Sequence, residues 1–219
     1  MSRREVSVVK ILNPSDRADA VAVVEQVFQQ EKQWIRRADD EIPRDLESNV
    51  RSSWFLCRVG DEPAGVIRLF YDPPLEAPPE LDFKFERDID FDRVLEGRRF
   101  ADIGRFMILP KYRRRIEVAL QLMKVAVAET VERGYTHFIT DVFESDPHCP
   151  LDFHTRVLGF ERIGTHRYGE LDCSSVRIIL VLDLARAYHR LARRRDRVFR
   201  QVVAGMQESF EALPVAPAL

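Results

Sequence analysis

The stretch FADIGRFMILPKYRRRIEVALQLM (100–123) decides the fold. Its first part is apolar and ends at Pro110, which is typical of a buried strand followed by a turn. After the basic turn PKYRRR, an apolar stripe at helical spacing predicts a helix over 112–133. The segment THFITDVFE (136–144) then reads as a second strand. A strand, a helix and a strand in this order predict a right-handed crossover between two parallel neighbours of one sheet.

The flanking segments predict a mixed α/β sheet around this crossover. A helix capped by Ser15 or Asp16 follows the first strand, and a short helix turns at Gly159 into a strand. Further strands are expected at 6–12, 52–60, 64–72 and 174–184, whereas 32–50 and 80–100 are expected to be mostly loop. We therefore expect a mixed sheet of about six or seven strands with helices on both faces.

Composition and charge limit the function classes. The 219 residues carry a formal net charge of −2, which disfavours a nucleic-acid partner. Cys57, Cys149 and Cys173 are widely spaced and include no CxxC pair, so neither a disulfide framework nor a zinc site is expected. There is no signal-peptide pattern and no apolar run long enough to cross a bilayer, and we expect a cytoplasmic protein.

The C-terminal segment differs from the rest in charge. We expect one domain over 1–184 and a basic amphipathic helix and tail over 185–219. One helical face carries apolar residues and the opposite face many arginines. This arginine face predicts either a solvated surface or contact of 185–203 with anionic lipid or a partner.

The order of elements, with PKYR between strand and helix and VLGFERIG at 157–164, resembles the GNAT acyltransferase superfamily over roughly residues 6 to 184. This resemblance implies that an acyl-CoA pyrophosphate binds at the helix N-terminus, where free N–H groups and the helix dipole favour an anion. The superfamily's usual turn is Arg/Gln-x-x-Gly-x-Gly/Ala. Here Arg113 fits the first position, but Ile116 and Val118 replace the glycines.

A narrower resemblance is to the autoinducer (acyl-homoserine lactone) synthases and the long-chain N-acyl amino acid synthases. The matching residues are Phe28, Trp34, Asp45, Arg68, Asp102 and Arg105. Val24 stands where the lactone synthases usually carry an Arg, Ser48 where a second loop acid is usual, and Asp102 where Glu is more common. The resemblance therefore implies N-acylation of another amine, with an acyl carrier protein or acyl-CoA as donor.

The resemblance also implies roles for individual side chains. Asp102 is expected to take a proton from the attacking amine, and Asp45 to bind its ammonium form. Arg105 joins Asp102 on one face only if a β-bulge intervenes, because residues three apart on a strand otherwise point to opposite faces. Amides near 106–108 are expected to hold the oxyanion. The remaining expected substrate contacts are Trp34, Phe28, Arg68, Phe106, Ile108, Phe138 and Val142, the last four around the acyl chain.

The basic turn is expected to hold the donor's phosphate through Arg113, Arg114 and Arg115. Many GNAT enzymes have a Tyr four residues before a Gly-Phe pair as the acid for the leaving thiolate; here that position is Thr155, beside His154. The segment DVFESDPHCPLDFH (141–154) gathers acids, His and Cys, but its spacing matches no known metal-ligand pattern, and no metal is expected.

Structural explanations compete with each of these roles. Asp102 and Arg105 would then form a structural ion pair, and Arg68 would be a solvent-facing strand residue. Trp34 would fill the core as an aromatic plug, and Asp45 would cap a helix. Arg113, Arg114 and Arg115 would be the solvated start of a helix. Three functions stay open at this point: an N-acyltransferase for a small amine, a CoA-dependent acetyltransferase, and a catalytically silent module that binds an acyl ligand.

Overall fold

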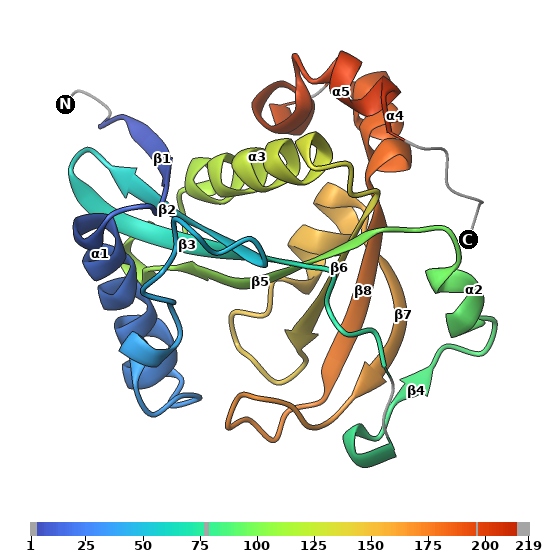
Figure 1. Ribbon diagram of the computed structural model, residues 1–219, viewed down its shortest axis with the longest axis horizontal. Coiled ribbons are helices and arrows are strands. Elements are labelled where there is room, and N and C mark those ends of the chain that lie inside the picture. Colours follow the sequence, from blue (N-terminus) through green and yellow to red (C-terminus); the bar gives the residue numbers. More distant parts are fainter. Residues whose placement is uncertain (1–3, 77–78, 196, 214–219) are drawn as a thin grey trace.

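The computed structural model describes residues 4–76, 79–195 and 197–213, which build an eight-stranded mixed sheet (Figure 1). The strand order is β1-β2-β3-β5-β6-β8-β7-β4. Their bounds are β1 Val6–Lys10, β2 Ser52–Val59, β3 Glu62–Tyr71, β4 Lys84–Phe85, β5 Phe100–Ile108, β6 His137–Phe143, β7 Glu161–His166 and β8 Arg177–Asp183. Of the neighbouring pairs, β5 and β6 are parallel and the others antiparallel. The predicted parallel crossover is thus confirmed.

Helices cover both faces of the sheet (Figure 1). The α-helices are α1 Pro14–Val24, α2 Phe91–Leu95, α3 Ile116–Glu132, α4 Leu184–Arg194 and α5 Gln207–Glu211. Short π-helical segments are η1 Glu25–Glu31, η5 Phe153–Leu158 and η6 Phe199–Val203, and 3₁₀ turns are η2 Ala38–Asp40, η3 Pro79–Leu81 and η4 Pro110–Tyr112. The predicted GNAT-like mixed α/β class is confirmed.

Two local predictions were wrong for identifiable reasons. The segment 80–100 contains α2 and the edge strand β4, whose two residues pair with β7 and are too few to show a strand period. The cap of α1 is Asn13, whose side chain accepts from the Asp16 N–H, with Pro14 in the first helical turn.

The C-terminal segment is not one helix. Arg195 adopts a left-handed conformation with φ 48° and ends α4, after which η6 and α5 follow. Its apolar side chains, including Tyr188, Val202 and Phe210, belong to the same core cluster as α3. The described part of 185–219 therefore completes the main core, residues 196 and 214–219 lie outside the described residues, and lipid or partner contact by 185–203 stays a prediction.

A β-bulge changes which side chains of β5 face which side. Gly104 pairs with Arg68 and Met107 with Val66, so Arg105 and Phe106 together lie opposite Ile67 of β3. Arg105 has φ 51°, a conformation that a side-chain-bearing residue rarely adopts. Before the bulge Ala101 and Ile103 pack on the α3 side; after it Phe106 and Ile108 do so. The bulge thus turns Asp102 and Arg105 to the same face, as the sequence analysis required.

The two parallel strands separate beyond the bulge. Pairing of β5 with β6 runs from Phe100↔His137 to Asp102↔Ile139 and then stops. The Thr140 hydroxyl, which donates to the Ile103 carbonyl at 2.7 Å, marks the point of divergence. This separation opens the sheet for a ligand beside Asp102.

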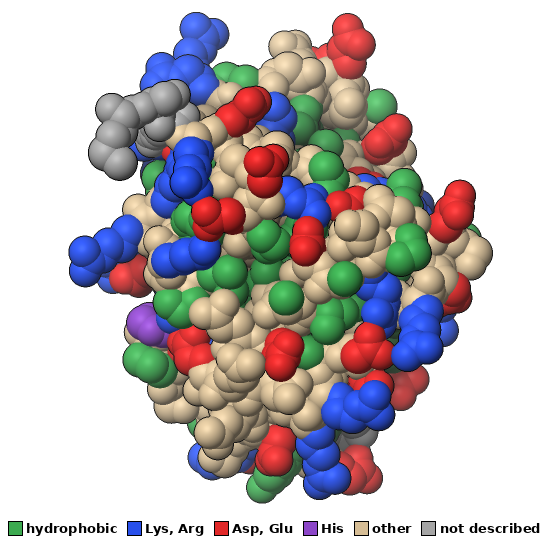
Figure 2. Space-filling model, turned by 90° about the vertical axis from the view of Figure 1, so that its left-hand side faces the viewer, with side chains coloured by type: hydrophobic (Ala, Val, Ile, Leu, Met, Phe, Trp, Pro, Cys, Tyr) green, Lys and Arg blue, Asp and Glu red, His purple; other side chains and the backbone are tan. Residues whose placement is uncertain are grey.

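Surface charge is mixed. On the face over β1 and α1, Lys and Arg side chains alternate with Asp and Glu and no wide area of one sign is visible (Figure 2). In the described ranges, no helix combines the length and apolar character that crossing a bilayer requires.

Replacing Gly65 with Ala should destabilise the protein by about 1–3 kcal/mol, because overpacking forces the backbone to shift. A Cβ at Gly65 would lie 2.6 Å from the backbone oxygen of Met107, so β3 and β5 would have to separate. Urea denaturation measures the free energy of unfolding. Val50→Ala, at a side chain 76% exposed, serves as control. Equal stability of Gly65→Ala and wild type would contradict this close approach.

Candidate active site

A cavity of about 740 Å³ lies where β5 and β6 diverge. The polar part of its wall includes Arg68, Asp102, Arg105, Asp141, His166, Glu170 and Arg177. An apolar part is formed by Pro73, Pro74, Leu75, Leu81, Phe83, Phe91, Ile139 and Ile179. A volume of this size lies within the range of about 300–1,000 Å³ found for small-molecule sites.

Asp102 and Arg68 form an ion pair in the cavity wall. An Nη of Arg68 lies 2.7 Å from Oδ2 of Asp102, and the Asp102 side chain is 25% exposed, so a substrate can reach it. Burial raises the pKa of the Asp102 carboxyl, and the charge of Arg68 opposes this only in part. A carboxyl group with a raised pKa beside a cavity is suited to accept a proton.

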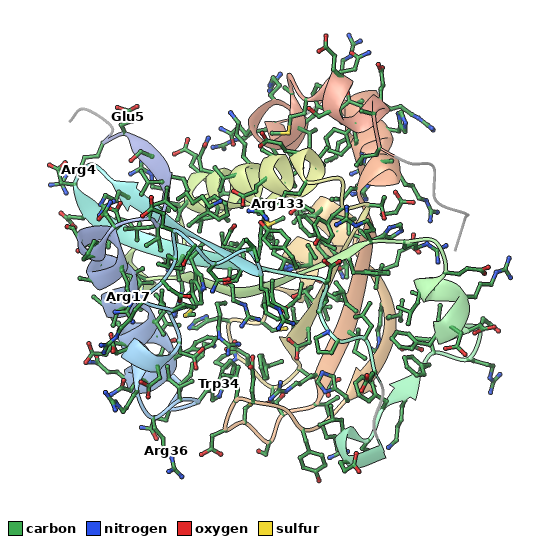
Figure 3. All side chains as sticks on the ribbon, viewed as in Figure 1. Arg4, Glu5, Arg17, Trp34, Arg36 and Arg133 are labelled. Atoms are coloured by element: carbon green, nitrogen blue, oxygen red, sulfur yellow. The ribbon has the colours of Figure 1, made fainter. Side chains whose placement is uncertain are left out.

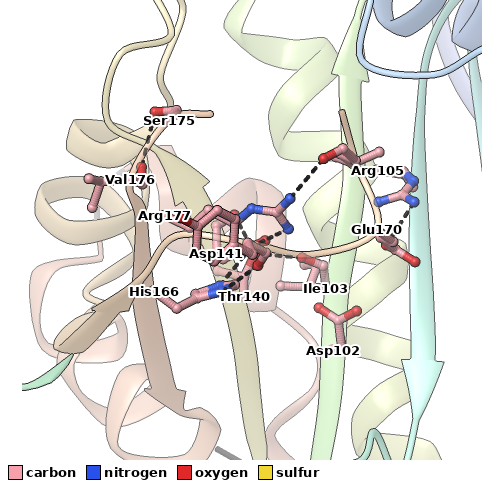
Figure 4. A network of polar contacts seen from close by, with 12 residues as sticks. Asp102, Ile103, Arg105, Thr140, Asp141, His166, Glu170, Ser175, Val176 and Arg177 are labelled. Carbon is pink, nitrogen blue, oxygen red and sulfur yellow. Dashed lines mark hydrogen bonds and ion pairs between the residues drawn. The ribbon is translucent and has the colours of Figure 1, made fainter. Parts of the chain in front are cut away.

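Arg105 contacts two acids that the sequence analysis did not identify. Its Nε donates to Glu41 at 2.7 Å. An Nη donates to Glu170 at 2.8 Å (Figure 4). The guanidinium also lies 5.6 Å from the ring centre of Phe28. Glu41 lies in the long N-terminal loop and Glu170 between β7 and β8, so Arg105 joins three distant parts of the chain.

A second charged group surrounds Asp141 on β6. His166 Nε2 lies 3.2 Å and Arg177 Nη1 3.4 Å from Oδ2 of Asp141 (Figure 4). Burial opposes ionisation, but the hydrogen bond from His166 and the charge of Arg177 outweigh it and lower the pKa of the Asp141 carboxyl. His166 Nδ1 lies 2.9 Å from the Tyr168 carbonyl, so both ring nitrogens of His166 face oxygen acceptors.

The predicted aromatic residues come together at one end of the cavity. Trp34 lies edge-on to Phe28 with ring centres 5.3 Å apart, and 4.2 Å from the ring centre of Phe143. The Lys32 ammonium lies 4.5 Å from the Trp34 ring centre and pairs with Asp146. Phe28 and Trp34 both line the cavity, so the structure places them where a substrate contact is available.

Two predicted residues are not at the site. Asp45 is exposed and absent from the cavity wall, and the acid of this loop that pairs with Arg105 is Glu41. Phe138 is fully buried and packs against Phe160, with ring centres 6.4 Å apart. Phe138 pairs with Ala101, where β5 and β6 are still joined, and its side chain packs in the core on the α3 side. Val142 lies beyond the last β5–β6 pair, where the strands have separated. The prediction that Phe138 lines the cavity is therefore wrong.

Phe106, Ile108 and Val142 do line the cavity. Phe106 stacks on Phe153 with ring centres 6.0 Å apart, near His154. Burial lowers the pKa of His154 to about 4, and its Nδ1 faces the Pro150 carbonyl at 2.9 Å. Because a carbonyl only accepts, the proton of neutral His154 sits on Nδ1 and its other nitrogen is not an acid.

The basic turn is largely neutralised. Arg113 pairs with Glu31 at 2.5 Å and donates to the Ile108 carbonyl, while Arg115 lies 3.3 Å from Glu117. Arg114 is exposed and has no ion pair with a described residue. Arg113 and Ile116 line the cavity, which places the start of α3 at one of its ends.

Sequence reasoning missed Glu41, Glu170, His166 and Arg177. No periodic pattern marks them, because Glu41 and Glu170 lie in loops and His166 and Arg177 lie at strand ends, and they meet only through the fold. The one available signal was Arg177, a charged residue opening an otherwise apolar strand. No group of three or more His, Cys, Asp or Glu side chains within the described ranges is arranged to hold a metal ion.

Comparison with known proteins gives a family and a fold. The sequence matches the family described as N-acyl amino acid synthase FeeM over residues 19–182. The structure of FeeM, an N-acyl amino acid synthase from uncultured soil microbes, is similar at a TM-score of 0.64 and 16% identity, covering 88% of this chain and 99% of that one. No curated protein matches the sequence.

Two acetyltransferase structures share the fold. Aminoglycoside 6'-acetyltransferase type Ii has a TM-score of 0.57 and 13% identity, covering 81% of this chain and 97% of that one. A putative acetyltransferase of the GNAT family from Desulfovibrio desulfuricans also has a TM-score of 0.57 and 13% identity, covering 82% of this chain and 99% of that one.

Arg68→Gln should raise the pKa of Asp102 further, because the nearest cation that favours its ionised form is removed. Carboxyl ¹³C NMR, with Asp102 assigned through Asp102→Asn, measures the titration midpoint. Arg36→Gln is the control, since Arg36 is exposed and projects outward, away from the cavity (Figure 3). The same midpoint in Arg68→Gln and Arg36→Gln would show that Arg68 does not control Asp102.

Proposed function

Because this chain belongs to the N-acyl amino acid synthase FeeM family and is an acyltransferase of the GNAT superfamily, we propose that it joins a long-chain acyl group to the amine of an amino acid. One observation carries the proposal. A carboxyl group with a raised pKa, Asp102, lies at the divergence of β5 and β6 beside a cavity with a large apolar wall. An acetyl group would leave most of that cavity empty.

Asp102 is the proposed proton acceptor. An ammonium group gives a proton to the Asp102 carboxylate, and the neutral amine attacks the thioester carbonyl. Attack forms the C–N bond and a tetrahedral intermediate, which then collapses as the C–S bond breaks and the thiolate leaves. The nitrogen loses its second proton and the thiolate takes up one proton, so the products are an amide and a free thiol, and the proton on Asp102 passes to solvent. Asp141, held ionised by His166 and Arg177, supplies negative charge that attracts the ammonium form.

The oxyanion of the tetrahedral intermediate is proposed to lie against β5. Beyond Asp102, β5 has no ladder to β6, so backbone N–H groups around Phe106 to Ile108 border the cavity without a strand partner on that side. Amides fixed in a strand are suited to stabilise developing negative charge, because they need no reorientation during the reaction.

The acyl donor is proposed to be a thioester on an acyl carrier protein. CoA carries a pyrophosphate and a further phosphate, which require several free cations or a glycine cradle. Arg113 and Arg115 are already paired with Glu31 and Glu117. Ile116, 41% exposed at the cavity wall, stands where a glycine would let the phosphates approach. The single phosphodiester of phosphopantetheine carries less negative charge than CoA and needs fewer cations at this turn. Arg114 remains available to contact an acidic surface of the carrier protein.

The proposal is tested by supplying the purified protein with acyl-carrier and acyl-CoA donors of several chain lengths and the twenty proteinogenic amino acids. Mass spectrometry should detect an N-acyl amino acid. Product from acetyl-CoA alone would identify the protein as a CoA-dependent acetyltransferase. Absence of product with every donor, while acyl ligands still bind, would favour the silent binding module.

Asp102→Asn should lower kcat by about 10²–10⁴-fold, because proton transfer by a positioned base contributes that much. In the wild type the rate should rise with pH as the Asp102 carboxyl ionises, and this limb should disappear in the variant. Asp45→Asn should keep wild-type activity, since Asp45 lies outside the cavity wall. Loss of activity in Asp45→Asn together with wild-type activity in Asp102→Asn would show that Asp45, and not Asp102, has the catalytic role.

Arg114→Ala should lower kcat/KM for the carrier-bound donor by about two- to fivefold at low salt, as expected for an exposed ion pair worth up to about 1 kcal/mol. The loss should shrink as ionic strength rises, because salt screens exposed charges. Arg36→Ala is the matched control. A rate independent of salt in both variants, or a clear preference for acyl-CoA, would exclude carrier docking at this turn.

A further inference from the structure

Two buried arginines in the cavity wall share one carboxylate from a loop. The side chains of Arg105 and Arg68 are 8% and 17% exposed, whereas that of Glu170 is 61% exposed. Arg105 Nη2 lies 2.8 Å and Arg68 Nη1 3.9 Å from the same oxygen of Glu170. Burial opposes ionisation of Glu170, but the charges of Arg105 and Arg68 outweigh it and lower its pKa. Asp102 pairs with Arg68 and Glu41 with Arg105, and Glu170 is the third acid at this pair and the most solvent-accessible of the three.

Glu170 leaves some hydrogen-bond donors of these two arginines without a partner. A separation of 3.9 Å from Arg68 is too long for a hydrogen bond. The Nε of Arg68 is buried and has no hydrogen-bond partner among the described residues. An unsatisfied donor on a buried guanidinium costs free energy. A carboxylate that sat deeper than Glu170 would gain the contacts that Glu170 leaves unmade.

We propose that Arg105 and Arg68 form the subsite for the carboxylate of the acceptor, and that Glu170 fills this subsite in the unliganded protein until the acceptor displaces it. This inference rests on the proposed function, because it assumes an acceptor that carries both an amine and a carboxylate. Beyond the proposed function, the inference assigns a role to Glu170, which controls binding of the acceptor and selects acceptors that carry a negative charge.

The position of Asp102 supports the subsite. Asp102 lies 2.7 Å from the other Nη of Arg68, so the proposed proton acceptor and the proposed carboxylate ligand are on the same side chain. In an α-amino acid the amine and the carboxyl group are attached to one carbon. A carboxylate bound by Arg105 and Arg68 therefore brings its amine next to Asp102, where deprotonation is required.

Displacement of Glu170 needs little rearrangement of the protein. Glu170 lies in the connection between β7 and β8, and the following backbone is held by the Asp172 N–H, which donates to the Trp34 carbonyl at 2.8 Å. Because its side chain is largely exposed, Glu170 can rotate into solvent while the backbone stays in place. Its charge is then hydrated, and the acceptor's carboxylate replaces it on the arginines.

The test compares Glu170→Gln and Glu170→Ala with wild type, using the best amino acid acceptor from the screen above and the α-carboxamide of that amino acid. If Glu170 occupies the subsite in about 70–90% of molecules, its removal should lower KM for the amino acid by about three- to tenfold with kcat little changed. The KM for the carboxamide should stay the same, because that acceptor has no charge to place on the arginines.

Glu47→Gln is the matched control, since Glu47 is an exposed loop residue outside the cavity wall. An unchanged or raised KM for the amino acid in both Glu170 variants, or an equal decrease for the carboxamide, would overturn the inference. If the wild type acylates no amino acid, the proposed function fails. Calorimetric titration of wild type and Glu170→Gln with each of the twenty amino acids then decides the subsite separately: tighter binding to Glu170→Gln supports it, and equal or absent binding rejects it.

Discussion

The β-bulge at Arg105 and Phe106 is the constraint on which the rest of the site depends. Without it, strand alternation would point Arg105 toward α3, and Asp102 would face the cavity with Arg68 as its cation but without Arg105 on the same face. A left-handed φ of 51° at a residue other than glycine costs about 1–2 kcal/mol. Contacts of 2.7 Å with Glu41 and 2.8 Å with Glu170 offset that cost, and they draw two loops onto the strand. The strained residue is therefore also the residue that assembles the wall of the cavity.

Two aspartates on adjacent parallel strands have environments that separate their pKa values. Burial dominates at Asp102, which has Arg68 as its close cation, whereas His166 and Arg177 together outweigh burial at Asp141. One carboxyl group is thereby suited to exchange a proton and the other to remain an anion, a division of roles that environment alone can impose on identical side chains. Because the charge of Asp141 raises the pKa of Asp102 by repulsion, the ionised state of Asp141 itself helps to make Asp102 a proton acceptor.

Those elements whose apolar residues repeat at strand or helix spacing could be predicted from the sequence. The strand, helix and parallel strand over 100–144 were predictable because apolar spacing and Pro110 mark them, and the need for a bulge followed from the odd spacing of Asp102 and Arg105. The loop acid was misassigned because Asp45 and Glu41 lie in the same polar segment, and only the path of the loop decides which one reaches Arg105. Glu170, His166 and the short strand β4 carry no such pattern and depend on tertiary contacts.

The distribution of charge in the cavity wall supports different recognition of the donor and the acceptor. At the start of α3 the arginines Arg113 and Arg115 are matched by nearby acids, so little free positive charge is left for a highly anionic donor. Elsewhere in the wall, Arg68 retains an unsatisfied buried donor and shares Glu170 with Arg105. A further part of the wall is apolar and contributes binding in proportion to the acyl surface it covers. A donor held mainly by its chain and an acceptor held mainly by its charge would meet beside Asp102, which lies in the same cavity wall.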